Sequence, residues 1–290
     1  MPQLLSITPL IQLNCINRND IYLKLESDQV GGSFKTRGIL NFINNNSIAK
    51  GYVTYTTGNH GIALAHLAKE LGFAAHIYCS STIENFKKEA IEKLGAFVNL
   101  LEGNDINALI AETQRFAKEN SLSFVPLYED NNLLQGYSKI AIEVYEAFNI
   151  PITVYIPLGS GSLVLANSKM LKEINPYNKI VAVEPTIYRR TNGYSQLNKS
   201  NSIADCLSID RIPDFNLKLY QYVDDIIDIT ESEILLAMQI IYDNLNIIVE
   251  PGGAIGLAAA LKDISSSKKV VVITGKNISK PSFLKYIERS

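Results

Sequence analysis

The sequence has few cysteines, no long apolar run and no cluster of positive charge. The three cysteines are odd in number and widely spaced, so they indicate neither a disulfide framework nor a zinc site. No apolar run approaches the roughly 20 residues of a membrane-spanning helix. The 27 Lys and Arg residues are spread among 29 Asp and Glu residues, which argues against the basic surface of a nucleic-acid-binding protein. We therefore expect neither a membrane nor a nucleic-acid partner.

The N-terminal stretch MPQLLSITPLIQLN also lacks the positively charged start of a signal or transit peptide. We therefore expect a cytoplasmic protein. The 290 residues are 47% apolar and 19% charged, which is typical of a globular protein. They are enough for one large or two smaller domains with a sizeable core. Cys79 lies in the apolar stretch HIYCS and is expected in that core.

Short apolar stretches alternate with longer segments of helical periodicity along the chain. The predicted strands are YVTYT (52–56), AHIYCS (75–80), FVNLL (97–101), TVYIPL (153–158), KIVAVEP (179–185) and KVVVITG (269–275). The last three are too apolar for strands with one face in water, which favours parallel sheets buried on both faces. Among the predicted helices, one carries Phe86, Ala90 and Leu94 on a single face. Another begins with the capping box formed by Thr230 and Glu233.

Three glycine-containing loops follow predicted strands. They are YTTGNHG (55–61), PLGSGSLVLA (157–166) and ITGKN (273–277). Each lies at the carboxyl end of a strand, where open α/β sheets place their ligands. The three loops therefore predict a ligand site.

The loop GSGSL is the best candidate for binding a phosphate group. Gly159 and Gly161 let backbone N–H groups approach an anion, and the hydroxyls of Ser160 and Ser162 add further donors. The helix that follows points its positive end at the same place. A tight strand-to-helix turn without a ligand is the alternative. The spacing matches neither a P-loop nor a dinucleotide-binding fingerprint.

Lys35 lies in the glycine-rich stretch DQVGGSFKTRG. A lysine on a solvated helix face is the simple interpretation, but such a helix does not need glycines, which reduce helix stability. One lysine among glycines, a phosphate-binding loop and further loops at strand ends together suit a cofactor that carries an aldehyde and a phosphate. Such a cofactor bonds to a lysine amine.

Seven stretches then match one family, in its order, between residues 26 and 277. They are GGSFKTRG, TTGNHG, PLGSGSL, AVEP, SIAD, EPGGAIGLAAAL and ITGKN. The chain resembles the fold-type II pyridoxal-phosphate enzymes, specifically the threonine dehydratase and serine racemase group. This resemblance implies pyridoxal 5'-phosphate as cofactor, an amino acid as substrate and a homodimer.

The resemblance also implies a role for each matching residue. Lys35 would bond to the cofactor aldehyde and later move the substrate's α-proton, and Phe34 would lie beside the cofactor ring. Asn59 would hydrogen-bond the ring's 3-hydroxyl, and Thr274 would face the pyridine nitrogen. The residues that would bind the phosphate are Gly159, Ser160, Gly161, Ser162 and Leu163. Those that would line the substrate carboxylate pocket are Thr57, Gly58, Asn59 and His60.

The implied reaction is β-elimination from a hydroxy amino acid such as L-threonine or L-serine, which yields a 2-oxo acid and ammonia. A hydroxyl at Thr274 would not hold a proton on the pyridine nitrogen as a carboxylate does, and this favours elimination over transamination. Thr57, the second predicted catalytic residue, stands where the family has a serine that serves racemases. The alternatives are a racemase, a β-replacement synthase, a threonine synthase-like enzyme or a catalytically silent cofactor-binding protein.

Two departures from the family pattern concern charge. Metal-binding relatives pair the Glu of Glu-Pro with a nearby Asp, but here Glu184 is followed by Arg190. An arginine would repel a cation, so we expect no metal. Lys276 replaces a glycine beside the pyridine nitrogen, and it either attracts a second anionic group of the substrate or points to solvent.

The resemblance implies two open α/β domains with the cofactor in the cleft between them. The large domain is predicted at 1–50 plus 129–290 and the small, mobile domain at 51–128, with boundaries good to several residues.

Overall fold

The computed structural model divides the chain into two compact units. The first contains residues 29–136 with residues 4–6, and the second contains residues 7–28 and 137–290. The residues that the structure describes are 4–14, 18–46, 50–56, 58–103, 105–128, 130–191, 194–195, 202–209 and 211–288, with only the backbone of 191, 194 and 195. The predicted division into a domain at 51–128 and a domain formed by the rest stays a prediction.

The first unit is built on a parallel four-stranded sheet in the order β5-β4-β3-β6. The strands are β3 (Gly51–Tyr55), β4 (Ala74–Ser80), β5 (Phe97–Leu101) and β6 (Ser123–Phe124). The helices are α1 (Lys35–Asn45), α2 (Asn59–Leu71), α3 (Asn85–Lys93) and α4 (Ile106–Asn120). α5 (Asn131–Phe148) follows, and from Tyr137 on it belongs to the second unit. α2 ends at Gly72, whose φ of 74° lies in the left-handed region that glycine adopts without strain.

The second unit contains a six-stranded sheet in the order β1-β2-β12-β7-β8-β11. The strands are β1 (Leu10–Gln12), β2 (Ile21–Leu25), β7 (Thr153–Pro157), β8 (Lys179–Pro185), β11 (Asp225–Ile229) and β12 (Lys269–Ile273). Only the edge strand β1 runs antiparallel to its neighbour among the described pairs. The strands β9 (Arg190–Thr191) and β10 (Tyr194–Ser195) form a separate short ribbon.

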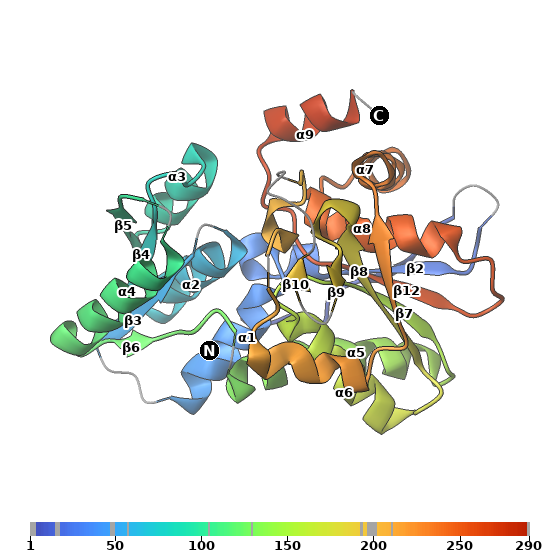
Figure 1. Cartoon of the computed structure of the whole chain (residues 1–290), viewed down its shortest axis with the longest axis horizontal. Coiled ribbons are helices and arrows are strands. Elements are labelled where there is room, and N and C mark those ends of the chain that lie inside the picture. Colours follow the sequence, from blue (N-terminus) through green and yellow to red (C-terminus); the bar gives the residue numbers. More distant parts are fainter. Residues whose placement is uncertain are drawn as a thin grey trace. The chain divides into compact units, whose positions relative to one another are not determined.

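Helices cover both faces of this large sheet. They are α6 (Ser162–Ile174), α7 (Glu231–Leu245) and α8 (Pro251–Lys262), while α9 (Lys280–Ile287) packs on α7. Figure 1 shows α7 and α8 on one side of the strands and α6 on the other, and α8 packs on β7 and β12. The capping box predicted at Thr230 and Glu233 is confirmed at the start of α7. The predicted α/β class with two open sheets is confirmed.

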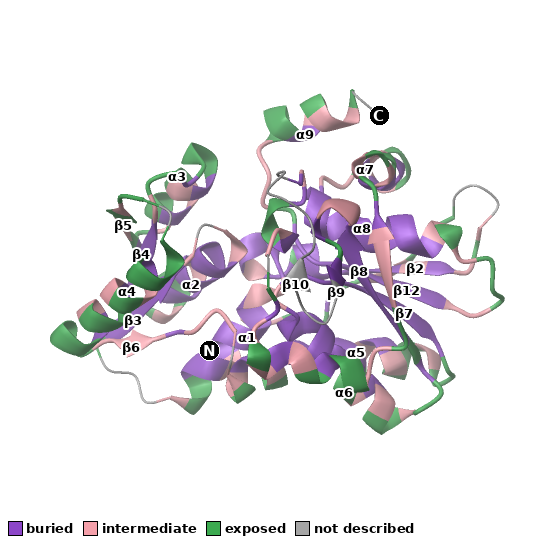
Figure 2. Ribbon diagram, viewed as in Figure 1, coloured by how far each residue is buried: buried purple, intermediate pink, exposed green. Residues whose placement is uncertain are grey.

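Burial follows the prediction for the central strands. Every residue of β7 and β12 is buried, as are all residues of β8 except Lys179, and Figure 2 shows these strands as the buried centre of the sheet. All residues of α8 up to Ala260 are also buried, because α7 and the sheet cover the helix together. Cys79 is fully buried as predicted, and burial raises the pKa of its thiol to about 11.

The apolar residues that the sequence places on one face of α3 do not mark its most buried side. Phe86 is 40% exposed, whereas Ile91 is fully buried. The Ile91 Cδ1 atom lies 3.3 Å from the position that a Cβ atom on Gly61 of α2 would take. Lys87 is also buried because its aliphatic stem covers apolar surface. Periodicity alone found the helix, but the packing against α2 decided which side faces inward.

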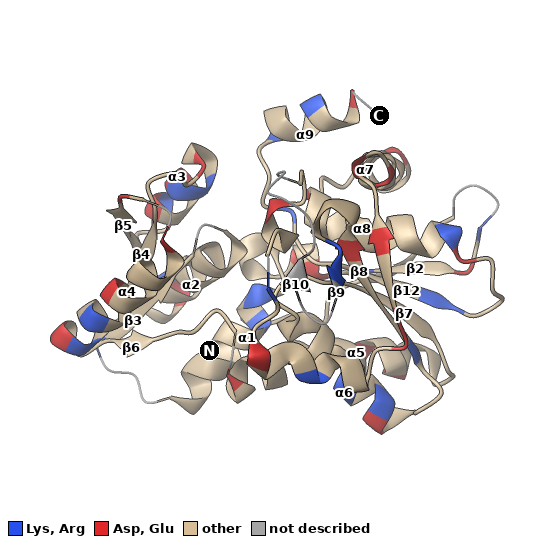
Figure 3. Ribbon diagram, in the orientation of Figure 1, with Lys and Arg blue, Asp and Glu red and all other residues tan. Residues whose placement is uncertain are grey.

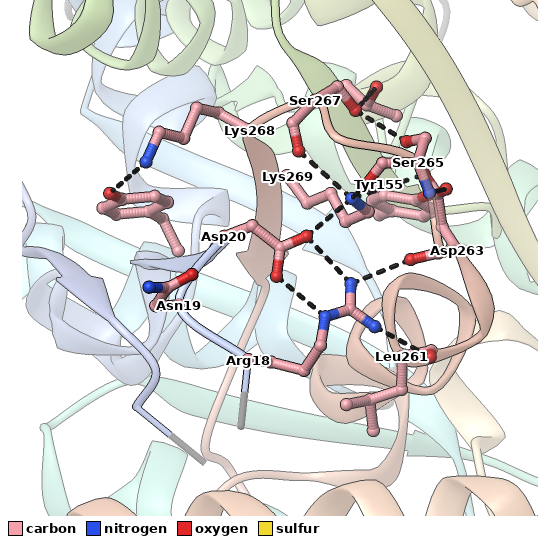
Figure 4. Close-up of polar contacts among 12 residues, drawn as sticks. Arg18, Asn19, Asp20, Tyr155, Leu261, Asp263, Ser265, Ser267, Lys268 and Lys269 are labelled. Atoms are coloured by element: carbon pink, nitrogen blue, oxygen red, sulfur yellow. Dashed lines mark hydrogen bonds and ion pairs between the residues drawn. The ribbon is translucent and has the colours of Figure 1, made fainter. Parts of the chain in front are cut away.

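Charged side chains form a network of hydrogen bonds and ion pairs at the end of the large sheet where its strands begin (Figure 4). Arg18 donates from Nε and Nη2 to the two oxygens of Asp20, at 2.8 and 2.9 Å. Lys269, the first residue of β12, is fully buried and donates to Asp20 Oδ2 at 2.7 Å. Asp263 accepts from the Tyr155 hydroxyl at 2.6 Å. The hydrogen bond from Arg18, followed by that from Lys269, lowers the pKa of Asp20 far below its ordinary value.

Charges of both signs alternate on the outer helices. Figure 3 shows Lys and Arg interspersed with Asp and Glu on α3 and α4, and on α4 Arg115 pairs with both Glu112 and Glu119. In the part of the chain that the structure describes, no helix has the length and apolarity to cross a membrane.

Candidate active site

Lys35 begins α1 in the first unit, directly after a turn made by two glycines. Gly31 and Gly32 have φ values of 78° and 70°, which other residues rarely adopt. A Cβ atom on Gly31 would lie only 3.0 Å from the Cα atom of Ala63 in α2. Gly31 is therefore required by a close backbone approach, and Gly32 by its positive φ. Lys35 Nζ lies 4.9 Å from the centre of the Phe34 ring, so the predicted catalytic amine and the predicted ring neighbour are together.

The start of α2 supplies the second part of the site in the same unit. Gly58 precedes the helix, and Asn59 and His60 form its first turn. The first N–H groups of an α-helix have no intrahelical acceptor and favour an anion. The catalytic residue predicted at position 57 lies outside the described residues. Gly61 is required for packing, because a Cβ atom there would lie 2.8 Å from Thr56 Cγ2.

His60 is buried at the start of this helix, with 2% of its surface exposed. Neither ring nitrogen has a hydrogen-bond partner among the described residues. Burial, and then the charge of Lys35, lower the pKa of His60 well below its ordinary value. The imidazole is therefore neutral at physiological pH, and it can both donate and accept a hydrogen bond to a ligand.

The loop between β7 and α6 belongs to the second unit and contains the residues predicted to bind a phosphate. Gly161 has a φ of 88°, and a Cβ atom there would lie 2.8 Å from Leu219 Cδ2. A Cβ atom on Gly159 would lie 3.2 Å from the carbonyl oxygen of Cys206. α6 begins at Ser162 and has 13 residues, so the loop ends at the positive end of a helix. This geometry fits the phosphate group predicted for Gly159 to Leu163.

Two buried side chains that sequence reasoning did not assign to this loop hold its carbonyl groups. Asn216, in the 3-10 segment Asp214–Gln221, donates from Nδ2 to the Ser160 carbonyl at 2.8 Å and to Ser162 Oγ at 3.0 Å. Arg190 donates from Nη1 to the Gly159 carbonyl at 2.8 Å. The contacts link positions that are about 30 and 55 residues apart in sequence, so no local pattern indicated them.

Glu184, at the end of β8, accepts from the backbone N–H of Arg190 at 2.8 Å. The two side chains form a buried ion pair, with 3.7 Å between Arg190 Nε and Glu184 Oε2. Burial raises the pKa of Glu184, although the N–H group and the charge of Arg190 oppose this shift. In the described part of the chain, no group of three or more His, Cys, Asp or Glu residues could hold a metal ion.

The loop after β12, also in the second unit, carries Thr274. Thr274 is buried, and its hydroxyl donates to the Gly252 carbonyl at 3.3 Å, beside the start of α8. The hydroxyl hydrogen can rotate toward another acceptor, because a hydroxyl has a single donor that turns about the C–O bond. Lys276, for which sequence reasoning left two orientations open, forms an ion pair of 3.2 Å with Asp28. Both partners of that pair are partly exposed.

Comparison with known proteins now gives the family. The family model described as pyridoxal-phosphate dependent enzyme matches residues 2–275. The chain belongs to this family. Its cofactor is therefore pyridoxal 5'-phosphate, and the predicted fold-type II architecture is confirmed.

Individual members of the pyridoxal-phosphate dependent enzymes are similar over nearly the whole chain. The L-threonine dehydratase catabolic TdcB of Staphylococcus aureus (strain N315) is 31% identical, over 93% of this chain and 84% of that protein. The L-threonine dehydratase biosynthetic IlvA of Pasteurella multocida is 28% identical, over 94% of this chain and 56% of that protein. A solved structure of maize serine racemase has a TM-score of 0.87 and 28% identity, covering 98% of this chain and 92% of that one.

The residues present suit this cofactor. The first unit holds an amine at Lys35 and the anion-binding start of α2, and the second holds the glycine-lined loop and the Thr274 hydroxyl. The aldehyde, the phosphate and the ring nitrogen of pyridoxal 5'-phosphate each need one of these groups. The roles of the individual residues stay predictions.

Proposed function

We propose that this pyridoxal-phosphate enzyme is an ammonia-lyase that converts a hydroxy amino acid such as L-threonine or L-serine into a 2-oxo acid and ammonia. The observation that carries the proposal is the 31% identity to a threonine dehydratase over 93% of the chain. The buried hydroxyl of Thr274 at the end of β12 supports it, because a hydroxyl leaves the ring a weaker electron sink than a carboxylate does.

Each predicted residue then has a defined task. Lys35 would hold the cofactor through its amine, and Phe34 would pack beside the ring. Asn59 would hold the 3-hydroxyl, and Thr274 would turn its hydroxyl hydrogen from the Gly252 carbonyl to the ring nitrogen. The phosphate is bound by the N–H groups and hydroxyls of the loop Gly159 to Leu163 and by the positive end of α6. When bound, pyridoxal 5'-phosphate withdraws electrons from the substrate's α-carbon and so acidifies its hydrogen.

The substrate carboxylate is proposed to lie at the start of α2. The N–H groups of the first turn point along the helix axis, and Gly58 leaves room for the carboxylate because nothing lies within 4 Å of a Cβ atom there. The neutral imidazole of His60 donates one N–H to an oxygen of the carboxylate, which satisfies a nitrogen that has no partner among the described residues. We also propose Thr57 as a lining residue of this pocket.

Lys35 performs the proton transfers. With the cofactor and substrate bound, the Lys35 amine would take the α-proton and return a proton to the β-hydroxyl, which would leave as water. The released enamine is hydrolysed to the 2-oxo acid and ammonia. One water molecule is lost and one is consumed, so the net reaction converts the amino acid to 2-oxo acid and ammonia without another reactant.

The test is a product analysis with the holoenzyme. L- and D-threonine and L- and D-serine are supplied separately, and ammonia, 2-oxo acid and the enantiomer of the remaining substrate are measured. We expect equal amounts of ammonia and 2-oxo acid from one L-hydroxy amino acid. If none of the four amino acids releases ammonia, the proposal is refuted.

The place of the covalent bond is tested separately. The holoenzyme is reduced with borohydride, digested and analysed by mass spectrometry, with a Lys69→Ala variant as control because Lys69 is an exposed lysine of α2. We expect the reduced adduct on Lys35 in both proteins. An adduct on a different lysine would contradict the assignment of Lys35.

Racemisation is the second candidate, because maize serine racemase is 28% identical with a TM-score of 0.87. The same product analysis separates the two reactions, since a racemase yields the opposite enantiomer without ammonia. We further propose a cytoplasmic homodimer with a large domain at 1–50 plus 129–290 and a small domain at 51–128. Light scattering of the purified protein tests the dimer.

A further inference from the structure

Arg190 and Glu184 form a buried ion pair beside the loop that we propose binds the phosphate. Each side chain is 1% exposed. Removing two charges from water is unfavourable unless their hydrogen-bonding groups are satisfied. The buried pair therefore needs further hydrogen bonds, and the Arg190 guanidinium makes them with backbone carbonyl groups.

The guanidinium contacts three backbone carbonyl groups. Nη1 donates to the Gly159 carbonyl at 2.8 Å, and Nη2 donates to the carbonyls of Leu207 at 2.9 Å and Leu158 at 3.3 Å. Leu158 and Gly159 are consecutive residues at the end of β7, and Leu207 belongs to the 3-10 segment Asp205–Leu207. A lysine could not make this set of contacts, because only the planar fork of arginine offers several donors in fixed directions.

These contacts orient the N–H groups of the loop. In a planar trans peptide the C=O and the N–H of the same unit point in opposite directions, and the described chain has no cis peptide bond. The carbonyls of Leu158 and Gly159 point at Arg190, so the N–H groups of Gly159 and Ser160 point away from it.

Asn216 extends the same arrangement by one peptide unit. The Asn216 side chain is uncharged, and its Nδ2 donates to the Ser160 carbonyl at 2.8 Å. The N–H of Gly161 is therefore turned away from Asn216. Arg190 and Asn216 together fix three consecutive peptide units from their carbonyl side.

We propose that Arg190 is a positioning residue for the cofactor phosphate: it holds the carbonyl side of the loop so that the N–H groups of residues 159 and 160 are already directed at the phosphate. The proposal rests on the proposed role of the loop Gly159 to Leu163. Preorganised donors need no reorientation on binding, so they strengthen binding without touching the ligand themselves.

The test compares two ligands that differ only in the phosphate. The holoenzyme is freed of cofactor with hydroxylamine, and its affinity for pyridoxal 5'-phosphate and for pyridoxal is measured by absorbance titration. We expect Arg190→Met to weaken binding of pyridoxal 5'-phosphate at least tenfold and binding of pyridoxal less than threefold. Arg190→Lys keeps the charge but loses the fork, and we expect an intermediate loss.

The matched control is Arg189→Met. Arg189 is the neighbouring arginine, its side chain is 69% exposed, and its Nε lies 3.9 Å from Asp228. We expect unchanged affinity for both ligands. If Arg190→Met does not fold, Arg190→Lys and Asn216→Ala decide the question, since both are expected to weaken binding of the phosphate-bearing ligand selectively.

If Arg190 had only a general structural role, Arg190→Met would weaken the binding of both ligands equally. That result would overturn the proposal, and so would unchanged binding of both ligands. Gly161→Ala separates this outcome from a wrong assignment of the loop, because it distorts the loop directly. Selective loss in Gly161→Ala without selective loss in Arg190→Met would overturn only the role of Arg190. Absence of a selective loss in both would show that the phosphate binds elsewhere.

Discussion

The two ends of the six-stranded sheet use charge in different ways. At the ends where the strands begin, Arg18, Asp20 and Lys269 pair with one another through their side chains. At the carboxyl end of β7, Arg190 directs its donors to backbone carbonyls. The first arrangement satisfies its own charges and stabilises the fold. The second leaves the opposite side of a glycine loop available to a ligand. Variants at the two kinds of position should therefore separate function from stability.

The largest expected effect is on turnover. Lys35→Ala removes the amine that we propose holds the cofactor and moves the proton, so kcat should fall at least about 10³-fold. The free energy of unfolding of the cofactor-free protein should change by less than about 1 kcal/mol, because Lys35 is only partly buried at the start of α1. Steady-state ammonia release and urea denaturation measure the two quantities. Full activity in this variant would show that another residue is the base.

The second largest effect is expected for Asp20→Asn, which should lose stability but little activity. Asp20→Asn removes the carboxylate that faces Arg18 and the fully buried Lys269. Lys269 keeps Asp263 at 4.0 Å and two carbonyl acceptors, but loss of its nearest negative charge should lower the free energy of unfolding by about 3 kcal/mol, while kcat/KM at 25 °C stays within about twofold. Asp214→Asn serves as control, because its pair with Arg211 is exposed, and it should cost less than about 1 kcal/mol.

The same carboxylate predicts part of the acid sensitivity. Arg18 and Lys269 lower the pKa of Asp20 in the folded protein. In the unfolded chain an aspartate has a pKa of about 3.9. Its stabilising contribution is therefore complete above that pH and is lost as the pH falls toward the folded-state value. Urea denaturation at a series of pH values should show a shallower decline in acid for Asp20→Asn than for the unaltered protein. Parallel curves would mean that Asp20 does not titrate differently on folding.

The smallest expected effect is at Lys276. Its ion pair with Asp28 joins two partly exposed side chains, so Lys276→Met should change the free energy of unfolding by less than about 1 kcal/mol. The kcat/KM for threonine or serine should change less than about twofold. A large change limited to amino acids with a second carboxylate would instead make Lys276 a specificity-determining residue.

The sequence predicts the elements and the motif-bearing loops well, because these depend on local patterns. The runs TVYIPL and KVVVITG contain the buried strands β7 and β12, and a glycine after each marks the place of a loop. The capping box of α7 depends on only four consecutive residues. Such features need no knowledge of the rest of the chain.

Features that join distant segments could not be predicted in the same way. Nothing near Arg190 in the sequence indicates that its guanidinium reaches the carbonyls of Leu158 and Leu207. The burial of Ile91 rather than Phe86 on α3 depends on where Gly61 of α2 leaves space. Long side chains and helix faces are placed by tertiary packing, which periodicity does not contain.

The close approach of Gly31 to Ala63 has a consequence for the substitutions that the first unit tolerates. The turn before Lys35 packs against α2, whose first residues are Asn59 and His60. A Cβ atom on residue 31 would lie 3.0 Å from the backbone of α2, so any larger residue there would have to push the two segments apart. The distance between the starts of α1 and α2 therefore depends on the absence of a side chain at this position.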